Sequence, residues 1–209
     1  MHKQVQTAWK SLFDVEHPVW QLAEKVWTVL VLNLLFVLTA LPIVTFGIAQ
    51  FSLVASLNQL RLKGKIAAVQ TFMSYAKTKW KQGLLLGGMD LALVFFSLGD
   101  FYLVRDMQAP VFEVFKVICV AVFVFSRLLF LYAYPLAVEM NRSLKEILVH
   151  AGLLVGVRLS LTLLVVLVQV VLVLLALWSG FSLLLVLSLL ATIGYAGLLY
   201  LFLLALHKK

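Results

Sequence analysis

Six stretches of this chain are rich in Val, Leu, Ile and Phe, and polar or basic residues gather between them. An α-helix needs about 20 predominantly apolar residues to cross a hydrocarbon core ~30 Å thick. The pattern predicts such helices at residues 25–44, 46–62, 82–104, 111–138, 151–178 and 181–206. We therefore expect an all-α fold, a polytopic transmembrane helical bundle. A cytoplasmic or interfacial segment at residues 1–24 precedes it.

The first two predicted helices form a hairpin. Pro42 follows Leu41 and lacks a backbone N–H, and its ring clashes with the preceding turn, so it ends the first helix. Thr45 comes next, and Gly47 supplies a permissive residue where the chain turns. Asn33 places an amide inside the first apolar stretch. These five residues define the hairpin motif.

The second predicted helix is the least apolar of the six. By hydropathy alone it could be a re-entrant segment, which would leave five crossings. Charge favours a full crossing, because residues 61–81 hold six basic residues and no acidic one: Arg61, Lys63, Lys65, Lys77, Lys79 and Lys81. Basic connections stay in the cytoplasm. Six crossings place every basic-rich segment, and both termini, on that side.

The basic segment also carries aromatic and apolar residues at helical spacing. This pattern predicts an amphipathic helix on the cytoplasmic membrane surface, with a partner protein as the alternative ligand. The whole chain is 64% hydrophobic and 12% charged, against about 45–50% and about 25% in soluble domains. Lipid is the solvent that suits this composition. The formal charge of +8 lies at the ends of apolar stretches, where it meets lipid headgroups, so we expect no nucleic-acid binding.

Two ionisable residues fall deep inside predicted helices. At ~1.5 Å per residue, Asp90 lies about 12 Å from the cytoplasmic start of its helix, and Arg127 lies about 16 Å from the cytoplasmic end of the next. Their depths match, and helices joined by a short loop are usually neighbours. We expect them to pair. The pair either fixes the helix register or forms a gate or substrate site near the midplane.

Small and amide residues predict helix contacts. Gly83 and Gly87 in one helix, and Gly152 and Gly156 in another, each lie four residues apart, a spacing that lets two backbones approach closely in lipid. We expect the 82–104 and 151–178 helices to pack on each other, with dimerisation as the alternative. Four amides are candidates for interhelical hydrogen bonds: Asn33, Gln50, Asn58 and Gln169.

The sequence predicts no catalytic residues, no metal ligands and no cofactor. The four His residues show no ligand spacing, and neither a phosphate-binding loop nor a nucleophile motif occurs. Asp90 and Asp100 are roughly 15 Å apart along one helix, too far to act together. We expect that the protein is not an enzyme.

The hairpin resembles a known family. The segments that carry the resemblance are Asn33-Leu34-Leu35-Phe36, Leu41-Pro42-Ile43-Val44-Thr45-Phe46-Gly47, Phe72, Lys77-x-Lys79-Trp80-Lys81 and Tyr134-Pro135-Leu136. They are similar to the signature of the YesL-like bacterial membrane proteins, a domain of unknown function, over about residues 20–200. The resemblance implies a multi-pass protein of the bacterial cytoplasmic membrane, encoded near carbohydrate-uptake systems. It implies no activity.

Two functions follow as expectations. The first is an accessory or assembly partner for carbohydrate uptake, bound to transporter or sensor membrane subunits. The second is a small self-contained transporter or channel, acting as a homodimer if a second half is needed. Breaks at Pro42 and Pro135 and the polar second helix are features of discontinuous transport helices.

Overall fold

A computed structural model describes residues 18–107, 109–140 and 142–207, and this part of the chain is helical with no strand. Its elements are α2 (Pro18–Ala40), the 3-10 turn η1 (Ile43–Thr45), α3 (Phe46–Lys63), α4 (Ala68–Thr78), α5 (Trp80–Val104), α6 (Pro110–Glu139), α7 (Leu144–Val157), α8 (Leu159–Trp178), α9 (Gly180–Leu189), the π-helical segment η2 (Leu190–Gly194) and α10 (Tyr195–Leu206). Within the described residues, six helical segments are long and apolar enough to cross a membrane. The all-α, multi-pass prediction is confirmed.

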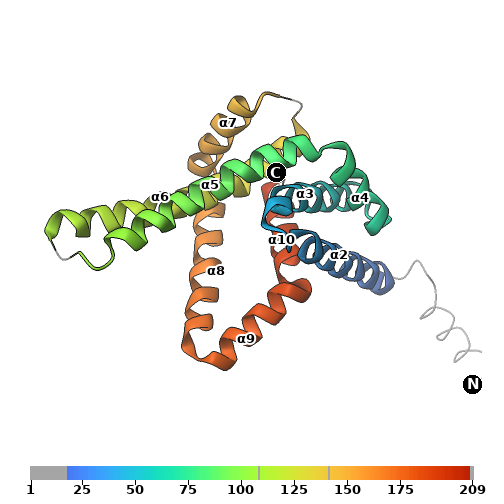
Figure 1. Ribbon diagram of the computed structural model, residues 1–209. Coiled ribbons are helices and arrows are strands. Elements are labelled where there is room, and N and C mark those ends of the chain that lie inside the picture. Colours follow the sequence, from blue (N-terminus) through green and yellow to red (C-terminus); the bar gives the residue numbers. More distant parts are fainter. Residues whose placement is uncertain (1–17, 108, 141, 208–209) are drawn as a thin grey trace, which may run out of the picture.

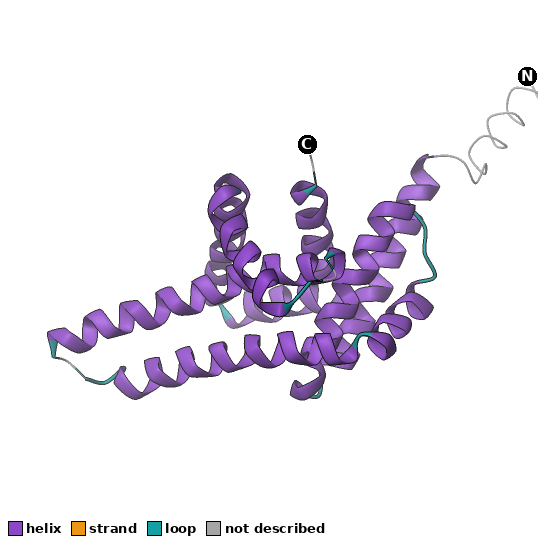
Figure 2. Cartoon of the chain, turned by 90° about the horizontal axis from the view of Figure 1, so that it is seen from above, coloured by secondary structure: helices purple, strands orange, loops and turns teal. Residues whose placement is uncertain are grey.

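Helix α3 lies at the centre of the structure. Two hairpins extend away from this centre, α5–α6 to one side and α8–α9 in another direction (Figures 1 and 2). In its membrane-length window 67% of α3 is buried, against 6% for α8. The polar residues that made α3 doubtful face inward: Gln50, Ser52, Ser56 and Asn58 are all buried. Helix α3 is thus one of the six segments long and apolar enough to span a membrane, and the protein itself buries its polar side chains.

The α2–α3 hairpin turns as Pro42 requires, although α2 begins earlier than predicted, at Pro18. Helix α2 ends at Ala40, two residues before Pro42, and η1 follows. The Thr45 hydroxyl lies between the carbonyls of Thr39 (2.5 Å) and Pro42 (2.8 Å) and closes the turn. The predicted segment 1–24 lies mostly outside the described residues.

Gly47 has a different role from the one predicted. It lies in the first turn of α3, and the only positive-φ residue in the described chain is Gly64, which ends α3. Gly47 is needed because a Cβ there would overlap backbone atoms of Gly83 and Gly87. The residue permits a close crossing of α3 and α5 rather than a turn.

The predicted packing of the two Gly-x-x-x-Gly segments is wrong. Gly83 and Gly87 face α3, whereas a Cβ on Gly152 would meet Leu129 of α6 at 3.8 Å and one on Gly156 would meet nothing within 4 Å. The spacing marks a helix face that is small, but it does not say which helix lies opposite.

The predicted helix at 151–178 is two helices. Helix α7 ends and α8 begins around Arg158, whose φ of −97° and ψ of 45° interrupt the helix. The Thr162 hydroxyl lies 3.0 Å from the Val155 carbonyl and 3.1 Å from that of Arg158, so it supplies a donor where the backbone ladder is broken. Sequence hydropathy missed the break because both sides are apolar.

Two other helices differ from the prediction in detail. Helix α6 continues through Pro135 to Glu139, so the expected break there is absent. The 181–206 segment starts at a capping box between Ser179 and Ser182 and bends through η2 into α10.

The basic segment forms the predicted amphipathic helix, α4, and its buried face contacts the α2–α3 hairpin while Val69 and Met73 stay exposed. Phe72 is fully buried, and the Tyr75 hydroxyl accepts a hydrogen bond from Gln59 at 2.7 Å. The hollow between Phe72 and the turn residues Pro42 and Thr45 has a volume of about 350 Å³. The chain thus runs back along the hairpin before α5 begins.

Candidate functional site: a buried polar centre

Asp90 and Arg127 form the ion pair that their depths predicted. Arg127 Nη2 contacts Asp90 Oδ1 between α5 and α6. The Asp90 side chain is 3% exposed and that of Arg127 is 30% exposed, so the carboxylate is enclosed and the guanidinium reaches its edge. An unpaired charge inside a membrane is costly, and each residue neutralises the other.

Two further polar groups lie near this pair without hydrogen-bond partners among the described residues. The Tyr134 hydroxyl and Gln50 Oε1 are both buried and unpaired. Tyr134 comes from α6, one residue before Pro135, and it lies close enough to Arg127 for the two to interact electrostatically. Most buried polar atoms in proteins are hydrogen-bonded, so these two atoms mark a place where polar contacts are incomplete.

Tyr195 brings α10 into the same centre. Its side chain lies within electrostatic range of the Gln50 amide and of Arg127. Its ring stacks on Phe36 of α2, with centroids 4.9 Å apart and planes 18° from parallel. We call Gln50, Asp90, Arg127, Tyr134 and Tyr195 the polar centre. It joins α3, α5, α6 and α10.

Asn33 binds the backbone on both sides of Tyr195. Its Nδ2 donates to the carbonyls of Leu190 (3.0 Å) and Ala191 (2.7 Å), and the Ala196 N–H donates to its Oδ1 (2.8 Å). A π-helical turn breaks the regular backbone ladder, and such turns are frequent at functional sites. The Asn33 amide therefore adds hydrogen bonds to backbone groups at η2, and it helps to fix the position from which Tyr195 reaches the polar centre.

The comparisons with known proteins find a partial match to one family model. The family model described as "Protein of unknown function, DUF624" matches residues 29–101. This segment, about a third of the chain, is similar to the DUF624 family. No curated protein and no solved structure matches the chain.

The DUF624 segment contains the hairpin motif, α4 and most of α5. It supplies Gln50 and Asp90 to the polar centre, while the other three members come from the later helices α6 and α10. Sequence reasoning had identified Asp90, Arg127 and Gln50 but missed Tyr134 and Tyr195. A tyrosine in the middle of an apolar helix is a signal that could have found both, because a buried hydroxyl usually needs a partner.

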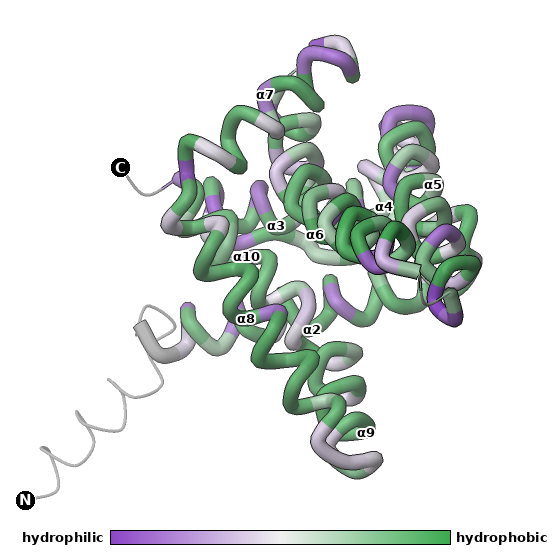
Figure 3. The backbone as a smooth tube through the Cα atoms, turned by 90° about the vertical axis from the view of Figure 1, so that its left-hand side faces the viewer, coloured by the Kyte–Doolittle hydropathy of each residue, from purple (hydrophilic) through white to green (hydrophobic). Residues whose placement is uncertain are grey.

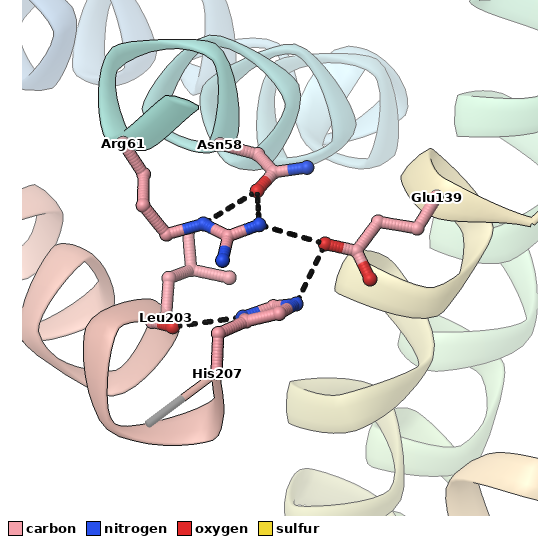
Figure 4. A network of polar contacts seen from close by, with 5 residues as sticks. All are labelled: Asn58, Arg61, Glu139, Leu203 and His207. Carbon is pink, nitrogen blue, oxygen red and sulfur yellow. Dashed lines mark hydrogen bonds and ion pairs between the residues drawn. The ribbon is translucent and has the colours of Figure 1, made fainter. Parts of the chain in front are cut away.

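A second network closes one end of the structure, where α3, α6 and α10 meet (Figure 4). Glu139 accepts from Arg61 Nη2 at 3.2 Å and lies 2.8 Å from His207 Nε2. Asn58 Oδ1 accepts two further bonds from Arg61, at 3.0 and 2.7 Å. The other His207 ring nitrogen lies 2.9 Å from the Leu203 carbonyl. The network ties the end of the DUF624 hairpin to the last helix.

The predicted basic residues do not form one surface. Arg61 belongs to the network above, and Lys65 pairs with Glu24 at 2.5 Å, at the end of the hairpin opposite its turn. Lys63 and the three later lysines, Lys77, Lys79 and Lys81, are exposed and form no ion pair among the described residues. The later three lie around the junction of α4 and α5, next to the Gly83 crossing.

The polar centre lacks the parts of a catalytic site. It holds one carboxylate, already paired, and two phenols, and it offers no nucleophile with an adjacent base. Among the described residues, no three His, Cys, Asp or Glu side chains gather where they could hold a metal ion. The arrangement can bind or orient a polar group inside the membrane.

Proposed function

We propose that this protein is an accessory or assembly subunit of a carbohydrate-uptake machine in the bacterial cytoplasmic membrane. One observation supports it most strongly. Helix α8 is the most apolar of the six spans and has only 6% of its window buried against its own chain. Figure 3 shows α8 and α9 as hydrophobic over almost their whole length. Such a surface needs lipid or the helices of another protein.

Gln169 favours another protein over lipid. It lies midway along α8, is exposed, and has no hydrogen-bond partner among the described residues. An amide facing hydrocarbon leaves its donors and acceptor unsatisfied, and interhelical bonds by such side chains stabilise contacts by about 0.6–2 kcal/mol. Thr162, near the start of the helix, is satisfied by contrast, with its hydroxyl 2.9 Å from that of Tyr132. The partner surface is therefore the middle and far part of α8.

The carbohydrate assignment rests on the resemblance to YesL-like proteins. The orientation rests on the basic connections, which favour cytoplasmic termini. We further propose that the protein is not an enzyme, since the polar centre lacks a nucleophile and base. The partner class that fits is a transporter or sensor membrane subunit.

Site-specific photo-crosslinking in native membranes tests the proposal. A crosslinking amino acid replaces Leu167 or Leu174 on α8, which are 63% and 61% exposed, or the control Leu201 on α10, which is 62% exposed. We expect the α8 positions to capture one permease or sensor subunit, and Leu201 to capture lipid. Gln169→Leu should lower the yield at both α8 positions without lowering stability. Equal yields at all three positions would exclude a specific α8 surface, and a partner unrelated to sugars would remove only the carbohydrate assignment.

A second function is a self-contained transporter, and the unpaired atoms of the polar centre favour it. Ionisable residues inside membranes commonly mark substrate or ion pathways, and the Tyr134 hydroxyl has no structural partner to explain its burial. Purified protein in liposomes should then carry out uptake that Asp90→Asn abolishes. Tyr134→Phe is the sharper variant, because it removes only an unpaired hydroxyl and leaves the fold intact. Absence of uptake by the unmodified protein would eliminate this function, and uptake that survives Tyr134→Phe and Asp90→Asn would exclude the polar centre as its pathway.

A further inference from the structure

A shallow groove runs along the outer face of α5. It has a volume of about 470 Å³, and its walls are Leu84, Leu85, Met89 and Ala92, with Gly88 as its floor. A Cβ at Gly88 would meet nothing within 4 Å. This glycine is therefore not needed for packing inside the protein, unlike Gly83 and Gly87 of the same helix. Its small size leaves the groove open.

One end of the groove is polar and cationic. Trp80 and Lys81 line it there, and Lys81 Nζ lies 5.6 Å from the centre of the Trp80 ring. Lys77 and Lys79 are close in sequence, and none of the three lysines has an acidic partner among the described residues. The neighbouring acids are engaged elsewhere, Glu139 with Arg61 and His207. Tryptophan prefers the membrane–water interface, so this end lies at headgroup level.

The dimensions suit one leaflet. From Lys81 to Ala92 the helix rises about 17 Å, and half of a ~30 Å hydrocarbon core is about 15 Å. An acyl chain lying in the groove would end near the bilayer midplane while its headgroup stayed beside the lysines. We propose that this groove is a binding site for an anionic phospholipid, whose phosphate is held by Lys81 and whose acyl chain lies over Gly88, with Lys79, two residues earlier, adding positive charge nearby.

The charge on the lipid follows from the lysines. Each basic residue near an anionic headgroup contributes about 1 kcal/mol, which is roughly a fivefold change in affinity. The double variant Lys79→Gln/Lys81→Gln should therefore weaken binding about 20-fold. Lys63→Gln is the matched control, because Lys63 is also exposed and unpaired but lies at the far end of α3.

The groove itself is tested at its floor. Gly88→Leu fills it, while Gly99→Leu adds the same side chain to the same helix at another open position outside the groove. Full-length protein in zwitterionic detergent is titrated with phosphatidylglycerol, phosphatidylcholine or glycerol phosphate, and bound lipid is counted by native mass spectrometry. We expect phosphatidylglycerol to bind at least tenfold more tightly than phosphatidylcholine. Gly88→Leu should abolish the preference, and Gly99→Leu should preserve it.

Three results would overturn the proposal. Equal binding of the two lipids would show that the lysines do not select charge. Competition by glycerol phosphate as strong as by the intact lipid would show that the acyl chain makes no contact. Unchanged lipid binding by Gly88→Leu, together with loss of a co-purifying protein, would assign the groove to a partner helix instead.

Discussion

Replacing Asn33 with Ala should destabilise this protein more than any other single amide substitution in its helices. The side chain makes three hydrogen bonds of 2.7–3.0 Å to the backbone around η2, all within the normal range for N–H···O bonds. Asn33 itself is fully buried. Removing it takes one hydrogen bond from each of the Leu190 carbonyl, the Ala191 carbonyl and the Ala196 N–H at a break in the helix, although the Leu190 carbonyl keeps the bond that it accepts from the Tyr195 N–H.

The expected loss follows from these bonds. Interhelical hydrogen bonds inside membranes contribute about 0.6 kcal/mol on average and up to about 1.7 kcal/mol. Three of them give about 2 kcal/mol at the average and nearer 5 kcal/mol at the upper limit. The buried setting favours the middle of this range, so we expect Asn33→Ala to lower the free energy of unfolding by about 3 kcal/mol.

Reversible unfolding in mixed detergent micelles measures this free energy, followed by the far-UV circular dichroism of the helices. Gln169→Ala is the matched control, since it removes an equally polar side chain that makes no hydrogen bond among the described residues. It should change the free energy by less than about 0.5 kcal/mol. A loss for Asn33→Ala no greater than for Gln169→Ala would refute the assignment of Asn33 as the residue that stabilises the π-helical turn.

Other substitutions test the remaining contacts. Gly47→Ala should separate α3 from α5 and cost about 2 kcal/mol or more in unfolding free energy, whereas Gly99→Ala, in open space, should cost nothing or slightly stabilise its helix. Asp90→Asn should cost about 3 kcal/mol because it strands the charge on its partner, and exchanging the two residues, Asp90→Arg with Arg127→Asp, should restore expression; absence of rescue would argue against the pair. Glu139→Gln should cost no more than about 1 kcal/mol, since that network is partly exposed, but it should speed hydrogen exchange at the end of α10.

The sequence predicted the number and approximate position of the spans because burial in lipid demands long apolar helices. It also predicted the Asp90–Arg127 pair, because the depth of a residue in the membrane follows from its position along the helix and the rise per residue. The crossing partner of Gly83 could not be found this way, since it depends on how two helices rotate and approach in space. The break at Arg158 escaped detection for a related reason, as apolar residues continue on both sides of it.

The sequence indicated only some of the residues of the polar centre. Charged residues stand out in an apolar helix, so Asp90 and Arg127 were noticed, whereas Tyr134 and Tyr195 resemble interfacial aromatics. The link between Asn33 and Tyr195 depends on a π-helical turn, and no residue pattern in the Leu190–Gly194 segment predicts one. Every residue has the same backbone carbonyl, and nearly every residue has the same N–H group. The sequence therefore does not show which backbone groups a distant side chain will bind.

The contact between Asn33 and Ala191 joins residues 158 positions apart, and this separation matters during synthesis. At ~5–20 residues per second a ribosome needs roughly 8 to 30 s to make the intervening chain. Throughout that interval the Asn33 amide has already entered the membrane, while the backbone groups that will satisfy it do not yet exist. Until the last helices are inserted, we expect α2 to stay in contact with the insertion machinery or with a membrane chaperone.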